Sequence, residues 1–282
     1  MSALFVLYSF NSTMIWYNHS LPRISCLLVT AAGRLDYFRK SCDCFFDQTY
    51  SNKELVIVNE GPKQYQQELA KYLDGRQGVK FVFLDGFYTL GALRNISIAF
   101  STGDIFVQWD DDDFNMPERL AIQYSHFSKQ NAPVCYFTEQ LHYYFDSGEL
   151  YWDSWSKFHS GGYKKFSLIP GTIMARKGVL DLRYPTGGTN CRAGEDSVLA
   201  YSLCQNEEDV FLLSEFGHMQ VYTFHGKNVW DIDHHKKISM ERAMPVSHML
   251  QHRKDLTKSI EYFQFQKPIR VMGREGLAFK YE

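Results

Sequence analysis

The stretch DIFVQWDDDDFNMP, residues 104–117, decides the fold. It opens with an apolar run of strand length, Asp104–Trp109, and four aspartates follow directly. Ligands of parallel α/β sheets bind outside the carboxyl ends of the strands. Adjacent carboxylates repel one another and raise each other's pKa values, and a hard cation such as Mg²⁺ or Mn²⁺ relieves that repulsion. A solvated acidic turn is the alternative, but the position after a strand favours a metal site.

Upstream of this stretch, apolar runs of strand length alternate with helical patterns. The expected strands are Ile24–Thr30, Leu55–Val58 and Val79–Leu84, and the expected helices are 35–46, Gln64–Leu73 and Leu90–Ser101. The strands are continuously apolar, which is typical of strands covered on both faces. The alternation therefore predicts an α/β fold with a mainly parallel, Rossmann-like sheet flanked by helices.

Beyond residue 130 the pattern changes. Val134–Tyr144 and Glu149–Trp155 read as antiparallel strands around the turn signal Asp146-Ser147-Gly148, and they predict a second, smaller antiparallel sheet. Residues 239–282 read as a separate helical appendage. This end of the chain is basic, because residues 236–282 hold ten lysines or arginines against five acidic residues.

Composition narrows the class of protein. The chain has 282 residues, a net charge of −2 and 45% hydrophobic residues, which fits one large domain or one domain with an appendage. The near-zero charge argues against a nucleic-acid-binding protein, and no apolar run approaches the roughly 20 residues that span a bilayer. The six cysteines form no C-x-x-C pair, so we interpret them as reduced thiols of a cytoplasmic protein.

Five segments, in this order, resemble the family 2 glycosyltransferases, which have the GT-A fold and use nucleotide-diphosphate sugars. Asp110-x-Asp112-Asp113 followed by Pro117 resembles the family's D-x-D-D-x-x-x-P segment. The other four segments are Gln48–Val58, Gly91–Asp104, Gly194–Asp196 and Tyr222–Asn228. Each is weakly specific alone, but their common order across residues 23–230 identifies the chain as a member of this family.

The resemblance implies donor-binding and metal-binding roles for the aspartates. Asp112 is the expected ligand of Mn²⁺ or Mg²⁺, Asp110 is expected at the ribose or the metal, and Asp111 lies with them in the donor site. His225 is expected as a further metal ligand or as a contact to the diphosphate. The remaining expected donor contacts are Thr30, Arg34, Glu60 and Arg94.

Two departures from the family pattern concern the base of the donor nucleotide. The usual D-D-G-S is here Asn59-Glu60-Gly61-Pro62, so Glu60 takes the position that hydrogen-bonds uracil. The aromatic residue that stacks on the base is missing after Thr30, and Arg34 is expected to stack there instead. We therefore expect a UDP-sugar as the donor, with the identity of the base left open.

The resemblance also implies an inverting transfer that needs a general base. Asp196 matches the family's base, and Glu195 lies beside it. A positioned base typically contributes about 10²- to 10⁴-fold to the rate. The alternative is that both acids merely stabilise the N-terminus of a helix, where negative charge is favourable.

Further candidates lie outside these segments. The aromatic candidates for stacking on a sugar are Trp152, Trp155 and Trp230, each of which is more often a core residue when taken alone. A second candidate metal cluster comprises His234 and His235 with Asp231 and Asp233. For these histidines, a lid over the donor or plain solvent exposure is the stronger interpretation.

These expectations divide the chain into four parts. Residues 1–22 form an extension, and a GT-A catalytic domain spans 23–238. Its nucleotide-sugar-binding half is 23–130, and its acceptor-binding half is 131–238. The appendage, 239–282, is expected to pack on this domain or on a second copy of the chain, with a peripheral contact at the inner face of a membrane as the alternative.

The expected function is metal-assisted transfer of a sugar to a hydroxyl group of a glycan, glycolipid or glycoprotein. A nucleotidyltransferase acting on a sugar phosphate is one rival, since such enzymes also pair carboxylates with a divalent ion. Residues Ala31-Ala32-Gly33-Arg34 are a poor match to its glycine-rich phosphate loop. A non-catalytic module that binds a nucleotide sugar is the other rival, and the presence of both Asp112 and Asp196 argues against it.

Overall fold

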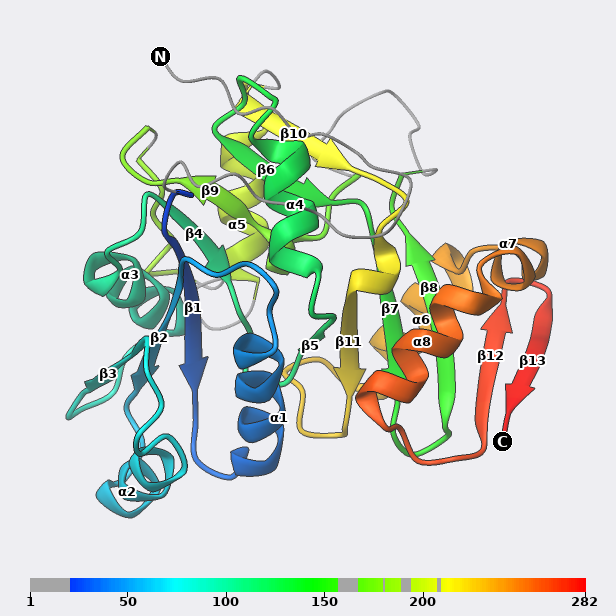
Figure 1. The fold of residues 1–282 in the computed structure, drawn as a ribbon, viewed down its shortest axis with the longest axis horizontal. Helices are drawn as coiled ribbons and strands as arrows, with labels where there is room; N and C mark the ends of the chain where they lie inside the picture. Colours follow the sequence, from blue (N-terminus) through cyan, green and yellow to red (C-terminus); the bar gives the residue numbers. More distant parts are fainter. Residues whose placement is uncertain (1–20, 157–166, 180, 189–193, 207–208) are drawn as a thin grey trace.

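The computed structural model describes residues 21–156, 167–179, 181–188, 194–206 and 209–282. Two sheets lie side by side in Figure 1, with β1–β4 on the left and β7, β8 and β11–β13 on the right. Most of the predicted extension, residues 1–20, lies outside the described part. The α/β fold predicted from the sequence is confirmed.

The first sheet has seven strands in the order β10-β6-β9-β4-β1-β2-β3. Its strands are β1 (Ile24–Thr30), β2 (Lys53–Asn59), β3 (Val79–Phe83), β4 (Ile105–Gln108), β6 (Val134–Phe137), β9 (Met174–Arg176) and β10 (Val210–Leu213). All neighbouring pairs are parallel except those of β9, which runs antiparallel to β4 and β6. The central strands are mostly apolar, as expected for strands with both faces buried.

Helices pack against the first sheet, as the apolar strands require. They are α1 (Leu35–Phe46), α2 (Lys63–Tyr72), α3 (Leu90–Phe100), α4 (Arg119–Phe127) and α5 (Glu195–Leu203). Each of the first three matches a predicted helix to within a few residues. Helix α3 approaches the segment around Tyr184 so closely that a Cβ on Gly91 would lie 2.0 Å from the carbonyl oxygen of Pro185. Asn95 then fixes this contact, since its side chain hydrogen-bonds both the N–H and the carbonyl oxygen of Tyr184.

The second sheet has six strands in the order β13-β12-β8-β7-β11-β5. Its strands are β5 (Phe114–Asn115), β7 (Glu139–Tyr144), β8 (Glu149–Ser154), β11 (Gln220–Phe224), β12 (Ile269–Gly273) and β13 (Gly276–Tyr281). The predicted hairpin is present as β7 and β8. The prediction of a small antiparallel sheet was wrong, because β11 pairs with β7 and β12 with β8 in parallel.

The predicted strand Val134–Tyr144 is two strands that belong to different sheets. Its first part is β6 in the first sheet, and its second part is β7 in the second sheet. The single residue between them is Thr138, whose N–H donates to the carbonyl oxygen of Leu213 at 3.0 Å. One predicted strand therefore crosses from the first sheet to the second.

The acidic segment, residues 110–113, is another crossing between the two sheets. It follows β4 in the first sheet and leads into β5, which pairs with β11 in the second. Gln48 fastens its far end, because its side-chain amide donates to the carbonyl oxygen of Met116 at 2.7 Å and accepts from the N–H of Leu120 at 2.9 Å. This is the physical role of the glutamine in the segment Gln48–Val58.

The C-terminal segment is not a separate helical appendage. The boundary expected at residue 239 falls inside α6 (Ile232–Arg242), and α7 (Val246–Gln251) and α8 (Arg253–Phe263) follow. Strands β12 and β13 then complete the second sheet. The buried face of α8, which includes Leu256, Ile260 and Phe263, joins the main hydrophobic core. Two short 3₁₀ turns complete the described elements, Pro170–Thr172 and Gly217–Met219.

Two aromatic residues of helix α8 contact the elements around the acidic segment and α1. Phe263 is 1% exposed, and its ring centroid lies 5.9 Å from that of Phe114, directly after the acidic segment. Tyr262 donates to Asp47 at 2.9 Å, so α8 also contacts the end of α1. The basic C-terminal segment therefore packs on the rest of the chain, which agrees with the expectation that residues 239–282 pack on the preceding domain. None of the described helices is long and apolar enough to cross a membrane.

The docking of α8 can be tested by deleting one ring. We expect Phe263→Ala to lower the free energy of unfolding by about 3–5 kcal/mol, the range for removing a buried phenylalanine side chain. Urea denaturation of the full chain would measure this. Phe87→Ala is the matched control because Phe87 is fully exposed, and it should change stability by less than about 0.5 kcal/mol. Equal effects of the two variants would show that α8 does not share the core.

Candidate active site

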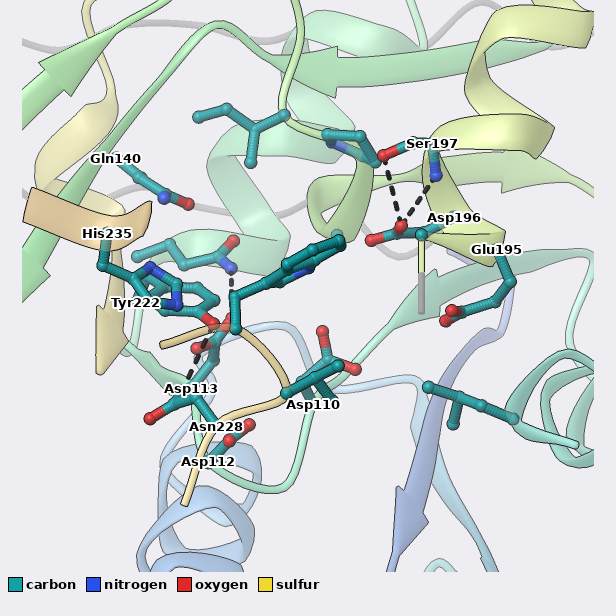
Figure 2. Close-up of a pocket in the computed structure, with 18 of the residues that line it drawn as sticks. Asp110, Asp112, Asp113, Gln140, Glu195, Asp196, Ser197, Tyr222, Asn228 and His235 are labelled. Atoms are coloured by element: carbon teal, nitrogen blue, oxygen red, sulfur yellow. Dashed lines mark hydrogen bonds between the residues drawn. The ribbon is translucent and has the colours of Figure 1, made fainter. Parts of the chain in front are cut away.

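A pocket of about 390 Å³ lies where the two sheets meet. Its floor is the acidic segment, and the N-terminus of α5 lines one side. Residues from β7, β11 and α6 line another side (Figure 2). Figure 2 shows the carboxylates of Asp110, Asp112 and Asp196 within this one pocket. The structure therefore brings together the acidic segment and the predicted base, which are more than 80 positions apart in the sequence.

Asp110 is held by two partners. The Nη1 atom of Arg94 lies 2.9 Å from its Oδ1 atom, and the side-chain amide of Gln108 donates to its Oδ2 atom at 2.8 Å. Gln108 in turn accepts a hydrogen bond of 2.9 Å from the hydroxyl group of Tyr184. Tyr184 is the residue that Asn95 fixes against α3, so the orientation of Asp110 depends on the packing of that helix.

Arg34 is the cation that joins the next two aspartates. Its Nη1 atom donates to Asp111 at 2.7 Å, and its Nη2 atom pairs with Asp112. Burial and then the neighbouring charge of Asp112 raise the pKa of Asp111 to about 7. Burial also opposes ionisation of Asp112, but the hydrogen bond from His225 and the charge of Arg34 lower its pKa below the ordinary value. Arg34 therefore pairs with carboxylates in this structure, and its expected stacking on the base stays a prediction.

His225 lies beside Asp112, and its expected role toward the metal or the diphosphate stays a prediction. Its Nε2 atom lies 3.1 Å from Asp112 Oδ2, and its ring stacks on Tyr37 with centroids 4.1 Å apart. Gly226 follows with φ of 77°, a conformation that side chains rarely adopt. Asn228 closes the turn, because it accepts from the N–H of His225 and donates to the carbonyl oxygen of Thr223. The segment Tyr222–Asn228 is therefore a support for His225.

Asp113 points away from its neighbours and into the second sheet. The side-chain amide of Gln220 donates to its Oδ2 atom at 3.1 Å. Burial and the charges of Asp112 and Asp110 raise its pKa well above the ordinary value. We expect Asp113 to be a structural member of the acidic segment.

The two acids of α5 have different surroundings. Glu195 is 2% exposed, and its carboxylate accepts from Nε of Arg94 at 2.7 Å. Asp196 forms no ion pair within the described part of the chain, and its visible hydrogen bonds come from Ser197. Burial and the charge of Glu195 raise the pKa of Asp196 to about 6, although Arg94 opposes the shift. Glu195 is thus a buried partner of Arg94, whereas Asp196 faces the pocket (Figure 2).

Two predicted donor contacts lie outside the lining of this pocket. The hydroxyl group of Thr30 lies 3.0 Å from that of Tyr65, and Glu60 accepts from the N–H of Tyr88 at 2.7 Å. Their roles toward the base stay predictions.

The three tryptophans that were candidates for sugar stacking fall into two groups, pocket residues and a core residue. Trp155 and Trp230 line the pocket, and Trp230 is 48% exposed and stacks on His234. Trp152 is a core residue instead, fully buried and donating to Glu139 at 3.1 Å.

The second candidate metal cluster does not form. Asp231 caps α6 by accepting from the N–H of His234, and His235 is buried. Across the described ranges, no group of three or more His, Cys, Asp or Glu side chains could hold a metal by itself.

The sequence analysis missed three polar residues of the pocket lining, which are Gln140 and His142 from β7 and Gln220 from β11. Tyr222 lies in a segment that resembles the family, but no role in the site was predicted for it. A signal was present, because Gln140 and His142 alternate with Leu141 and Tyr143, which face the core. Period-two alternation places such polar residues together on the opposite face of a strand.

The residues of the acidic segment fit a divalent cation that is shared with a diphosphate. Asp110 and Asp112 offer carboxylate oxygens, and His225 offers an imidazole nitrogen. Asp111 Oδ2 beside them is buried and has no partner among the described residues. Mg²⁺ typically binds through one or two carboxylates together with substrate phosphates. Such a cation does not require the three-residue protein cluster that is missing here.

Solved structures of similar fold include one that holds UDP-GlcNAc and one of a mannosyltransferase. S. aureus TarS 1-349 in complex with UDP-GlcNAc is similar at a TM-score of 0.55 and 15% identity, over 73% of this chain and 60% of that one. The mannosyltransferase PcManGT from Pyrobaculum calidifontis, in complex with GDP-Man and Mn²⁺, is similar at a TM-score of 0.54 and 13% identity, over 84% and 64%. The chain thus spans about 60% of the TarS structure. No curated protein matches its sequence significantly.

These likenesses show the GT-A type of fold that the sequence predicted. The model of the family described as "Glycosyl transferase family 2" matches residues 26–183, which is more than half of the chain. That match covers the acidic segment and the elements that position it. The chain belongs to glycosyl transferase family 2.

Proposed function

We propose that the chain transfers a sugar from a nucleotide-diphosphate sugar to an acceptor hydroxyl group, with inversion at the anomeric carbon. The donor would be a UDP-sugar by preference. Family membership supports glycosyl transfer in general, and solved relatives hold UDP-GlcNAc or GDP-Man. The observation that carries the proposal is the position of Asp196, a carboxylate without an ion pair among the described residues, in the same pocket as the acidic segment.

In this mechanism Asp196 is the general base. It accepts the proton of the acceptor hydroxyl group as that oxygen attacks the anomeric carbon and the nucleoside diphosphate leaves. A base must be ionised and free of competing cations, which fits Asp196 better than Glu195. Glu195 instead orients Arg94. The guanidinium group of Arg94, which extends from α3, bridges Glu195 on α5 and Asp110, and so joins the two sides of the pocket.

The acidic segment would hold the donor. Asp110 and Asp111 would contact the nucleotide, and Asp112 and His225 would hold Mn²⁺ or Mg²⁺. When bound, the cation offsets the charge that develops on the leaving diphosphate. Arg34 pairs with Asp111 and Asp112 in the structure. With the donor bound, its guanidinium group would also contact the phosphates.

The acceptor would be a glycan, a glycolipid or a glycoprotein. The cytoplasmic location, the peripheral membrane contact and the contact with a second copy through residues 239–282 stay predictions. Packing of α8 into the core supports an integral role for this segment over a free anchor.

Product analysis with an Asp196 variant tests the proposal. Wild-type chain incubated with UDP-GlcNAc or GDP-mannose and an acceptor extract should release nucleoside diphosphate. Asp196→Asn should bind the donor normally by calorimetry and lose at least about 10²-fold in turnover, because a base acts in the transition state. Release of pyrophosphate from a nucleoside triphosphate and a sugar phosphate would indicate the nucleotidyltransferase rival. Near-normal turnover of the variant would place the base elsewhere.

The pH profile of kcat/KM should report the ionisation of the Asp196 carboxyl group. Because burial and Glu195 raise its pKa to about 6, and because a base acts when deprotonated, kcat/KM should be level above that pH. Below it the rate should fall about tenfold per pH unit. Donor affinity measured over the same range separates this titration from that of Asp111. A flat profile between about pH 5 and 7 contradicts the assignment.

Metal dependence should run through Asp112. We expect UDP to stabilise the protein more in Mn²⁺ than in a chelator, by about 2.7 kcal/mol when the complex is at about 100 Kd. Thermal shift measures this increment, and Asp112→Asn should remove most of it. Asp111→Asn is the comparison, because Asp111 shares the partner Arg34 but is expected to contact the nucleotide and not the metal, so it should weaken UDP equally with and without Mn²⁺. Equal losses in both variants would attribute the effect to Arg34.

A further inference from the structure

One wall of the pocket carries buried polar atoms without partners. This wall, which we call the β7–β11 wall, consists of Gln140, His142, Gln220 and Tyr222. Gln140 Oε1, His142 Nε2 and Gln220 Oε1 each lack a hydrogen bond within the described part of the chain. The three residues are between 1% and 5% exposed. Unpaired buried polar atoms are rare in folded proteins, so three of them on one wall of one pocket indicate a missing ligand.

The orientation of His142 follows from a buried network behind it. Its Nδ1 atom donates to Asp153 Oδ2 at 3.1 Å, and the hydroxyl group of Ser239 donates to the same oxygen at 2.9 Å. Tyr144 lies 3.0 Å from Ser239 and stacks on the ring of His142. In the neutral imidazole this arrangement places the proton on Nδ1. The Nε2 atom is then a lone-pair acceptor.

Gln220 is oriented in the same way by a carboxylate. Its amide nitrogen donates to Asp113 Oδ2 at 3.1 Å, so its Oε1 atom is the end without a partner. An amide oxygen, like the neutral imidazole nitrogen, can only accept. At His142 Nε2 and Gln220 Oε1 the wall therefore offers lone pairs, and these two atoms need hydrogen-bond donors from a ligand.

No Lys or Arg side chain belongs to the β7–β11 wall. Among the described residues that line the pocket, the Lys and Arg side chains are Arg34 and Arg94, and both already pair with carboxylates. His235 packs beside the wall with its ring centroid 5.2 Å from that of His142. Burial and the neighbouring His142 lower the pKa of His235 to about 3, so it is uncharged at neutral pH.

We propose that the β7–β11 wall binds hydroxyl groups of an uncharged sugar, with His142 Nε2 and Gln220 Oε1 as hydrogen-bond acceptors. The proposal rests on the proposed function and adds the class of sugar. A sugar ring presents many O–H donors, whereas a carboxylate or phosphate presents lone pairs that His142 Nε2 and Gln220 Oε1 would repel. Trp155 and Trp230 line the same pocket and can cover the apolar face of such a ring. Asp153 and Ser239 are positioning residues for His142.

The test compares sugar-dependent binding in matched variants. Calorimetry would use UDP, UDP-GlcNAc and UDP-glucuronate, and nucleotide release would follow transfer to methyl glycosides and to methyl glycosiduronic acids. The variants are Gln220→Met and His142→Phe. Gln123→Met is the control, because Gln123 is also fully buried with an unpartnered Oε1 but lies outside the pocket lining. If His142→Phe fails to fold, Gln220→Met carries the test.

Two results support the proposal and identify the source of the sugar. If the wall holds the donor sugar, Gln220→Met weakens UDP-GlcNAc by about two- to tenfold, the range for one neutral hydrogen bond, and leaves UDP unchanged. If it holds the acceptor, UDP-GlcNAc binding is unchanged and the KM for methyl glycosides rises by a similar factor. In either case the wild-type chain should disfavour the uronic acid form.

Three results overturn the proposal. Variants that match wild type in both assays would show that the wall touches no sugar. A loss equal to that of Gln123→Met would show a general packing effect. Uronic acids that bind or react as well as their uncharged counterparts would contradict the class of ligand. In all three cases nucleotide binding by the wild-type chain keeps the proposed function intact, whereas a wild-type chain that binds no nucleotide sugar ends both proposals.

Discussion

Four consecutive carboxylates packed between two sheets are the constraint on which the rest of the structure depends. Like charges this close destabilise one another unless cations are held beside them. Arg34 comes from the turn before α1 and Arg94 from α3, and together they reach Asp110, Asp111 and Asp112. Each arginine thus ties a helix of the first sheet to the crossing between the sheets. Loss of either one would leave buried carboxylates uncompensated, which is costly.

The first half of the fold could be predicted from the sequence because its signals are local. Continuous apolar strands alternate with amphipathic helices, and β1, α1 and β2 lie where the pattern placed them. Several residues of the family-like segments make hydrogen bonds that hold the scaffold together. Gln48 and Asn95 hold backbone around the site, and buried Glu54 accepts from Ser25 and Thr102.

The second half escaped prediction because its pairings are distant. Strand β12 is beside β8, about 120 positions earlier in the sequence, and no local pattern carries that information. The difference between Glu195 and Asp196 is of the same kind. Two adjacent acids look alike in a sequence, and only the reach of Arg94 from another helix assigns one to an ion pair and the other to the pocket. The polar alternation along β7 was visible, but its meaning depended on what faces it.

The parallel pairing of β12 with β8 has a consequence for the order in which the molecule is made. Domains fold progressively as the chain emerges during synthesis, N-terminal parts first. Strands β1–β4 have all their neighbours except β9 within the first 110 residues. Strand β8 gains its outer neighbour only with Ile269–Gly273, near the end of the chain. The nascent protein therefore keeps an open edge on β8 until almost the whole chain has emerged.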